Sequence, residues 1–131
     1  MASPILLVED DSLLLEVLER LLTKAGFSVV VAIDGPEAIQ RLEELSPSLV
    51  LLDLVIPRLD GFEVLKQIRA NPKFAHVPVI ILSNLGSPED IKKATDLGAA
   101  DYWIKAASVP EEIIRKVHAV LDAEPKGSAQ A

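Results

Sequence analysis

The sequence predicts an α/β fold, namely a doubly wound, five-stranded parallel sheet with helices on both faces. Short apolar runs alternate along the chain with longer amphipathic stretches, which is the pattern of successive βαβ units. The apolar runs are continuous and do not alternate with polar residues, so both faces of the sheet should be covered. We expect the strands near residues 4–8, 28–32, 49–52, 79–82 and 100–104.

The first two helices have recognisable start and stop signals. Asp11 or Ser12 can cap the first helix, which should end at Gly26. Its apolar residues recur at helical spacing and are Leu14, Val17, Leu18, Leu21 and Leu22. The second helix should open at Asp34-Gly35-Pro36, because proline suits the first turn, and should end at Ser46-Pro47.

Three further helices should follow the third, fourth and fifth strands. The first of these should run from about Gly61 to Ala70, with Phe62, Leu65 and Ile68 buried. The next has a cap and an acidic first turn at residues 87–90 and should end at Gly98. In the last, Ser108 and Glu111 form a capping-box pattern. Its inward-facing residues should be Ile113, Ile114, Val117 and Val120.

Length and composition limit the classes of protein that the chain can represent. A chain of 131 residues fits a single domain, expected over residues 1–123, with residues 124–131 as a flexible C-terminal tail. The net charge of -7 argues against direct contact with nucleic acid. Cysteine is absent and no apolar run is long enough to cross a bilayer, so we expect a cytoplasmic protein without membrane contact.

Three of the predicted strands end on charged residues. The first runs into Glu9-Asp10-Asp11, the third into Asp53 and the fifth into Lys105. Each has a simpler explanation when taken alone, because Asp11 can cap a helix, Asp53 can start a turn and most lysines lie at the surface. The carboxyl ends of parallel strands, however, open into one crevice, where these carboxylates should face the lysine.

Such a cluster suits a divalent cation and a phosphoryl group. Mg²⁺ prefers oxygen ligands and typically takes one or two carboxylates together with phosphate oxygens and water. Without a cation, Glu9, Asp10 and Asp53 would repel one another, and burial would disfavour their ionised forms further. We therefore expect Mg²⁺ as the cofactor.

Four motifs, in this order along the chain, resemble the response-regulator receiver domain of two-component signalling. They are Val8-Glu9-Asp10-Asp11, the segment LDLVIPRLDG over residues 52–61, Ile81-Leu82-Ser83, and the segment GAADYWIK over residues 98–105. The resemblance covers about residues 4–121 and implies a flavodoxin-like receiver fold.

The resemblance also implies a role for each site residue. Asp53 is the phospho-acceptor, Ser83 binds the phosphoryl group and Lys105 pairs with it. Tyr102 matches the aromatic switch residue, which turns inward as Ser83 moves toward the phosphoryl oxygens. The implied Mg²⁺ ligands are Glu9, Asp10, Asp53 and the backbone carbonyl of Val55. The protein would then be a phospho-acceptor with self-catalysed phosphotransfer and slow autodephosphorylation, and not a metabolic enzyme.

The chain departs from the family pattern at two positions beside the site. Asn84 follows the hydroxyl residue where the family usually has a small residue, and Ala106 follows the lysine where the family usually has proline. Because a cis bond before a non-proline residue costs about 3 kcal/mol, we expect the Lys105–Ala106 bond to be trans. Val55 and Leu85, which in this family flank the route of the attacking water, are apolar here.

The resemblance implies a histidine kinase or a histidine phosphotransfer protein as donor and an effector protein as target. The alternative is a non-phosphorylated, receiver-like scaffold that binds its partners constitutively. An aspartate-nucleophile phosphohydrolase is disfavoured, because such enzymes need a second aspartate where Val55 stands. Asp101, Glu111 and Arg115 lie where dimerising receivers carry complementary charges, which leaves a phosphorylation-dependent homodimer open, although solvated surface charge is the favoured interpretation.

Overall fold

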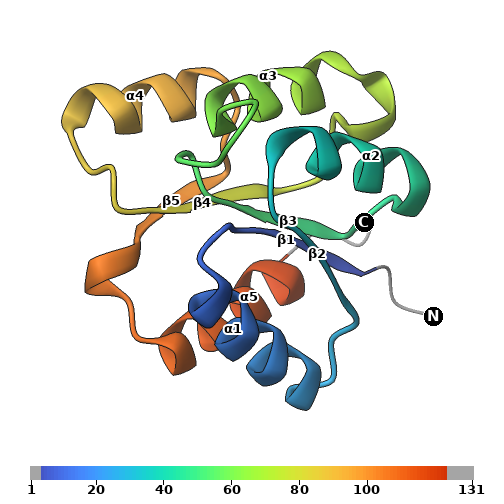
Figure 1. The fold of residues 1–131 in the computed structure, drawn as a ribbon, viewed down its shortest axis with the longest axis vertical. Helices are drawn as coiled ribbons and strands as arrows, with labels where there is room; N and C mark the ends of the chain where they lie inside the picture. The colour runs from blue at the N-terminus through green and yellow to red at the C-terminus, as the bar shows by residue number, and fades with distance from the viewer. Residues whose placement is uncertain (1–3, 124–131) are drawn as a thin grey trace.

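The computed structural model describes residues 4–123 and contains a parallel sheet of five strands in the order β2-β1-β3-β4-β5 (Figure 1). The strands are β1 (Ile5–Val8), β2 (Val29–Ala32), β3 (Leu49–Leu52), β4 (Val79–Ser83) and β5 (Asp101–Ile104). The predicted fold class and the five predicted strands are therefore confirmed. The tail predicted over residues 124–131 lies outside the described residues.

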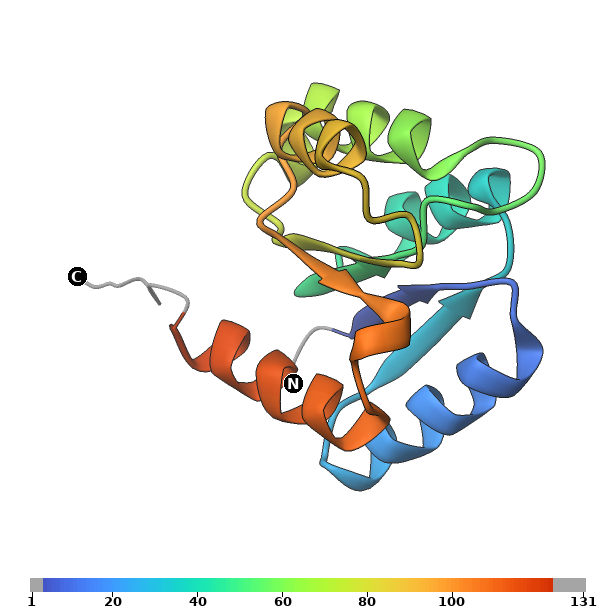
Figure 2. The ribbon, with the colours of Figure 1, turned by 90° about the vertical axis from the view of Figure 1, so that its left-hand side faces the viewer.

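Helices enclose the sheet from both sides. They are α1 (Ser12–Lys24), α2 (Gly35–Leu45), α3 (Gly61–Ala70), α4 (Pro88–Asp96) and α5 (Pro110–Ala123). Figures 1 and 2 show α2, α3 and α4 on one face, and α1 and α5 on the other. Two short 3₁₀ turns, η1 (Pro72–Phe74) and η2 (Lys105–Ala107), were not predicted. Within residues 4–123, none of the helices has the length and apolar character needed to span a bilayer.

The helix starts follow the capping signals of the sequence at three places. The side chain of Asp11 accepts hydrogen bonds from the backbone at the start of α1, as Asp34 does for α2 and Ser87 does for α4. These bonds satisfy amide groups that have no partner inside the helix. They also determine where each strand-to-helix loop ends, and hence where the residues at the strand ends lie.

Two sequence expectations about the helices are wrong. Phe62 is only half-buried, with Lys93 Nζ 4.2 Å from its ring centre, whereas Val64 is fully buried, because the inward stripe of α3 passes through Val64, Leu65 and Ile68. The Ser108 capping box is not formed either. The Ser108 hydroxyl donates to the Ile104 carbonyl at 2.7 Å, since Ser108 ends the η2 turn and α5 begins only at Pro110.

The core consists of two apolar clusters separated by the sheet. Alternate residues of each strand point to opposite faces, so Leu6 and Val8 pack toward α2 and α3 while Ile5 and Leu7 pack toward α1 and α5. Leu18, Leu22, Ile113 and Val117 complete the second cluster, and all are buried. Both faces of β1 and β3 are therefore covered, which confirms the inference from their continuous apolar runs.

Gly61 connects the core with the end of β3. A Cβ atom at this position would lie 2.4 Å from the Asp53 carbonyl oxygen and 2.5 Å from Leu54 Cα. The Gly61 N–H also donates to the Leu54 carbonyl at 3.0 Å. Since both close neighbours belong to the backbone, neither can swing aside, and only glycine fits without moving the chain beside Asp53.

We predict that Gly61→Ala lowers the free energy of unfolding by about 2 kcal/mol, the usual scale for overpacking. Gly86→Ala is the matched control, because the atom nearest to a Cβ there is Ile104 Cδ1 at 3.1 Å, the end of a flexible side chain, and the nearest backbone atom is 4.0 Å away. The control should change stability by less than about 0.5 kcal/mol. Urea denaturation measures both, and equal losses would exclude the backbone contact as the cause.

Candidate functional site

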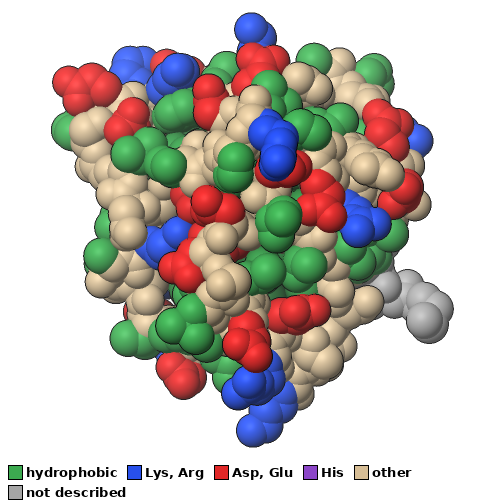
Figure 3. Space-filling model, viewed as in Figure 1, with side chains coloured by type: hydrophobic (Ala, Val, Ile, Leu, Met, Phe, Trp, Pro, Cys, Tyr) green, Lys and Arg blue, Asp and Glu red, His purple; other side chains and the backbone are tan. Residues whose placement is uncertain are grey.

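The carboxyl ends of β1, β3, β4 and β5 meet at one edge of the sheet, where a cleft opens. The Asp53 N–H donates to the Val8 carbonyl at 3.1 Å, which places Asp53 next to Glu9. The residues that line the cleft are Glu9, Asp10, Asp11, Asp53, Val55, Ser83, Asn84 and Lys105. The fold thus gathers every predicted site residue except Tyr102. Figure 3 shows acidic and basic side chains interspersed over one face of the molecule.

The acidic residues form a compact cluster. One carboxylate oxygen from each of Glu9, Asp10 and Asp53 lies within 4.8 Å of the others. Glu9 is 1% exposed and Asp53 is 4% exposed, whereas Asp10 is open to solvent. Burial raises the pKa of the Glu9 carboxyl above its ordinary value, although hydrogen bonds from Lys105 and from the Asp11 N–H oppose the shift. Glu9 therefore needs positive charge nearby to stay ionised.

Lys105 supplies part of that charge. Its Nζ lies 2.8 Å from Asp53 Oδ2 and 2.9 Å from Glu9 Oε1. Burial disfavours the ammonium, but the hydrogen bonds to Asp53 and Glu9 outweigh it, so the pKa of Lys105 is raised. Lys105 is consequently a cation at neutral pH. The lysine reaches the acidic cluster with a trans bond to Ala106, as predicted.

The acidic cluster fits an oxygen-ligated divalent cation. Three carboxylates with clustered oxygens are a suitable donor set for a hard cation, which prefers carboxylate, carbonyl and water ligands. Lys105 contacts one oxygen of Asp53, and the other, Oδ1, accepts the Val55 N–H at 3.2 Å. That bond keeps the loop after β3 against the carboxylate. Glu9, Asp10 and Asp53 are the residues whose carboxylate oxygens lie close enough together to share one ion.

Ser83 and Tyr102 are linked through the loop that follows β4. The Ser83 hydroxyl oxygen accepts the Leu85 N–H at 3.3 Å, and the Tyr102 hydroxyl donates to the Leu85 carbonyl. Tyr102 is half-buried, and burial raises the pKa of its hydroxyl, with Asp90 and Asp53 adding to the shift. The hydroxyl therefore stays protonated and available as a donor. Tyr102 lies outside the cleft but contacts the loop that forms one wall of it.

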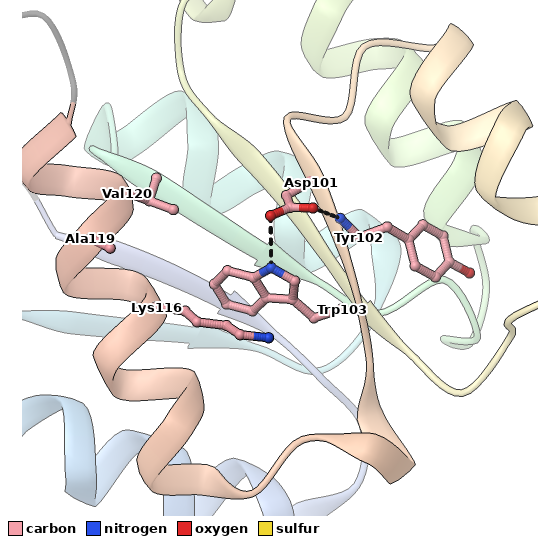
Figure 4. Close-up of a pocket in the computed structure, with 6 residues that line it drawn as sticks. All are labelled: Asp101, Tyr102, Trp103, Lys116, Ala119 and Val120. Carbon is pink, nitrogen blue, oxygen red and sulfur yellow. Dashed lines mark hydrogen bonds between the residues drawn. The ribbon is translucent and has the colours of Figure 1, made fainter.

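The two aromatic residues of β5 point to opposite faces of the sheet. Figure 4 shows Trp103 directed toward α5 and Tyr102 directed away from it. Asp101 bonds to both residues. Its Oδ2 accepts the Trp103 Nε1–H at 2.9 Å, and its Oδ1 accepts the Tyr102 N–H at 2.8 Å. Lys116 Nζ lies 5.2 Å from the centre of the Trp103 ring. Both carboxylate oxygens of Asp101 thus accept hydrogen bonds from residues of the same strand.

One contact at the site was missed by the sequence analysis. The Ala106 N–H donates to Asn84 Oδ1 at 2.8 Å. Asn84 and Ala106 are the two departures from the family pattern, which the sequence presents as separate changes. Their separation of 22 residues leaves no local signal that one contacts the other. The only available clue was that both departures flank residues of the same site.

We predict that Lys105→Met lowers the free energy of unfolding by about 3 kcal/mol in the presence of EDTA, because it leaves two buried carboxylates without their cation. Lys92→Met is the matched control, since its ion pair with Asp96 is exposed on both sides and should contribute little to stability. Urea denaturation at neutral pH compares the two. A Lys105→Met loss no larger than the control would show that the buried ion pair does not stabilise the fold.

Comparison with known proteins places this chain in a family. The response regulator receiver domain family matches residues 5–118. The chain is 38% identical over 117 residues to the probable transcriptional regulator ycf27 of Guillardia theta, a match that covers 89% of this chain and 44% of that protein. The chain therefore spans less than half the length of this relative.

The fold also resembles solved structures. The BeF3-activated N-terminal receiver domain of Klebsiella pneumoniae RstA has a TM-score of 0.82 and 28% identity, covering 90% of this chain and 97% of that one. The Mn(2+)-bound form of response regulator Rcp1 has a TM-score of 0.78 and 25% identity, covering 98% and 99%. With the family match over residues 5–118, these observations establish that the chain belongs to the response regulator receiver domain family of two-component signalling.

Proposed function

We propose that this domain is a phosphorylation-dependent signalling switch in which Asp53 accepts a phosphoryl group from a histidine kinase or a histidine phosphotransfer protein. The position of Asp53 carries the proposal: its carboxylate lines an open cleft, 2.8 Å from the Lys105 ammonium. A structural ion pair needs only one carboxylate. Glu9 and Asp10 place further negative charge beside it, and a bound cation would explain their presence.

The residues of the cleft have complementary roles in phosphoryl transfer. A carboxylate oxygen of Asp53 forms a bond to phosphorus while the bond between phosphorus and the donor's leaving atom breaks, which gives an acyl phosphate. Lys105 neutralises charge on the phosphoryl oxygens, and the Ser83 hydroxyl donates a hydrogen bond to one of them. A bound Mg²⁺ would supply further charge neutralisation. The Mn(2+)-bound and BeF3-activated relatives support this assignment.

We predict that incubation with acetyl phosphate and Mg²⁺ adds one phosphoryl group, and that EDTA or Asp53→Asn prevents the addition. Intact mass spectrometry measures the product. Asp60→Asn is the matched control: Asp60 caps α3 outside the cleft, asparagine caps equally well, and this variant should be labelled normally. Labelling that persists in Asp53→Asn would refute the site. A wild-type protein that takes up no phosphate would favour the constitutive scaffold.

The signal would travel from Ser83 to Tyr102 through the loop between them. Movement of the Ser83 hydroxyl toward a phosphoryl oxygen breaks its bond to the Leu85 N–H, and Leu85 is the residue whose carbonyl accepts the Tyr102 hydroxyl. Tyr102 would then turn inward and change the surface that an effector protein contacts. A nearly complete shift between two such states needs about 5 kcal/mol, which several charge-assisted hydrogen bonds can supply.

We predict that Ser83→Ala leaves Asp53 able to accept phosphate but removes the response of Tyr102. The reason is that alanine has no hydroxyl to follow the phosphoryl group. NMR chemical shifts of the segment from Ser83 to Tyr102, recorded with and without acetyl phosphate, test this. Identical shift changes in the wild type and in Ser83→Ala would place the coupling in other residues.

We also predict that the phosphorylated form is long-lived for a receiver. Val55 lines the cleft and is 58% exposed, and Leu85 lies half-buried beside Ser83. Neither side chain can orient an attacking water, and hydrolytic phosphoryl transfer depends on such positioning. Loss of phosphate after removal of the donor, followed by intact mass, should be faster in the double variant Val55→Asn, Leu85→Glu. An unchanged rate of loss would contradict this explanation.

A further inference from the structure

The two residues that depart from the family pattern are the two partners of one hydrogen bond. The Ala106 N–H donates to Asn84 Oδ1 at 2.8 Å and connects the loop after β4 with the loop after β5. Both partners are required for it. Proline at position 106 has no N–H to donate, and a small apolar residue at position 84 has no oxygen to accept. The departures therefore form a matched pair and not two independent changes.

The bond also caps a 3₁₀ turn. The turn η2 begins at Lys105, and the residue before it, Ile104, offers no side-chain cap. Amide groups in the first turn of a helix have no partner within it, so an outside acceptor stabilises them. Asparagine is among the best capping residues. The η2 turn has no cap from its own preceding residue, and Asn84 caps it from the loop after β4.

The capped turn starts at the lysine of the site. Lys105 Nζ contacts Asp53 Oδ2 and Glu9 Oε1, and Ala106 is the next residue along the chain. In the family pattern, proline would restrict the backbone after the lysine. Here alanine leaves that backbone unrestricted, and the bond to Asn84 holds it in place. On the other side, Asn84 directly follows Ser83, so the bond joins the neighbours of two residues proposed to contact the phosphoryl group.

We infer that Asn84 is a positioning residue: by accepting the Ala106 N–H it holds the η2 turn so that Lys105 remains over Asp53 during phosphoryl transfer. This inference rests on the proposed function, because it assigns a role within phosphorylation of Asp53. The Asn84 side chain does not need to touch the phosphoryl group. Within residues 4–123 its Oδ1 is used by Ala106, and its Nδ2 donates no hydrogen bond.

The inference differs from two other roles for Asn84, and the direction of a mutational effect separates them. If Asn84 only obstructs access of the donor, Asn84→Ala should speed phosphorylation of Asp53. If its Nδ2 contacts the phosphoryl group, Asn84→Ala should slow phosphorylation whatever residue occupies position 106. The positioning role predicts slower phosphorylation only where position 106 has an N–H to donate.

The test compares four proteins: wild type, Asn84→Ala, Ala106→Pro and the double variant. The initial rate of Asp53 phosphorylation by acetyl phosphate with Mg²⁺ is followed by intact mass. Asn84→Ala should lower the rate about fivefold, the scale of one lost hydrogen bond. In the Ala106→Pro background the same change should have no effect, whatever proline does to the rate. A rate increase in Asn84→Ala, or an equal loss in both backgrounds, would overturn the inference.

Asn71→Ala is the matched control. Asn71 Oδ1 accepts the Lys73 N–H at 3.0 Å and so caps the other 3₁₀ turn, η1, just before β4 and away from the cleft. Amide hydrogen exchange should become faster at Lys73 in Asn71→Ala and at Ala106 in Asn84→Ala. Only Asn84→Ala should change the phosphorylation rate. An effect of Asn71→Ala on that rate would show that loss of a cap acts through general stability.

A separate measurement tests the positioning role without phosphate. If Asn84 holds Lys105 over Asp53, the stability lost in Lys105→Met should be smaller in the Asn84→Ala background than in the wild type, as measured by urea denaturation. An equal loss in both backgrounds would overturn the inference. If the wild type takes up no phosphate, the proposed function fails, but this cycle and the Ala106 exchange rate still decide whether Asn84 positions the lysine.

Discussion

The arrangement of the cleft depends on the neutralisation of buried negative charge. Parallel pairing aligns Val8 with Leu52, so the residues that follow, Glu9 and Asp53, come side by side at the strand ends. Two carboxylates removed from water in this way repel each other and lose hydration. Lys105 is the cation in contact with both within residues 4–123. The loops around the cleft therefore have to keep the lysine that follows β5 close to the acids that follow β1 and β3.

Close backbone contacts hold Glu9 and Asp53 in position. Gly61 lets α3 approach the Asp53 backbone, which no other residue type allows without displacement. Asp11 caps α1 with its side chain and donates its own N–H to Glu9, so the helix start and the acidic cluster are one structural unit. The carboxylates of Glu9 and Asp53 are therefore held in place by backbone segments that have little freedom to move. A phosphoryl group or a cation would meet a preorganised site.

The loop after β4 connects the cleft with a residue outside it, Tyr102. The loop after β4 contacts Ser83 at the cleft and Tyr102 on β5, while Trp103, which donates to Asp101, packs in one apolar cluster with Ile113 and Val117 of α5. Tyr102 lies between Asp101 and Trp103 in the strand, and its hydroxyl bonds to that loop. A change of charge at Asp53 would act on that loop first, since the core beneath it is fully packed. The Asn84–Ala106 bond adds a second connection from the same loop to Lys105.

The sequence by itself determined the elements and most of the site. Continuous apolar runs predicted buried parallel strands, capping residues predicted where α1, α2 and α4 begin, and the parallel topology predicted that Glu9, Asp10, Asp53 and Lys105 meet. These features depend on local geometry and on a general rule of sheets, so they can be inferred from residue patterns. The trans bond before Ala106 followed in the same way from the energetics of a single peptide group.

Only the tertiary structure decided which groups contact one another across loops. Ser108 has the pattern of a helix cap, but its hydroxyl bonds to the Ile104 carbonyl, because an unforeseen 3₁₀ turn delays the start of α5. Phe62 lies at the edge of the core, under Lys93 of α4, because the buried stripe of α3 passes through Val64, Leu65 and Ile68. Asn84 caps a turn 22 residues away. Such contacts depend on how segments distant in sequence are placed relative to one another, and local propensities do not predict that placement.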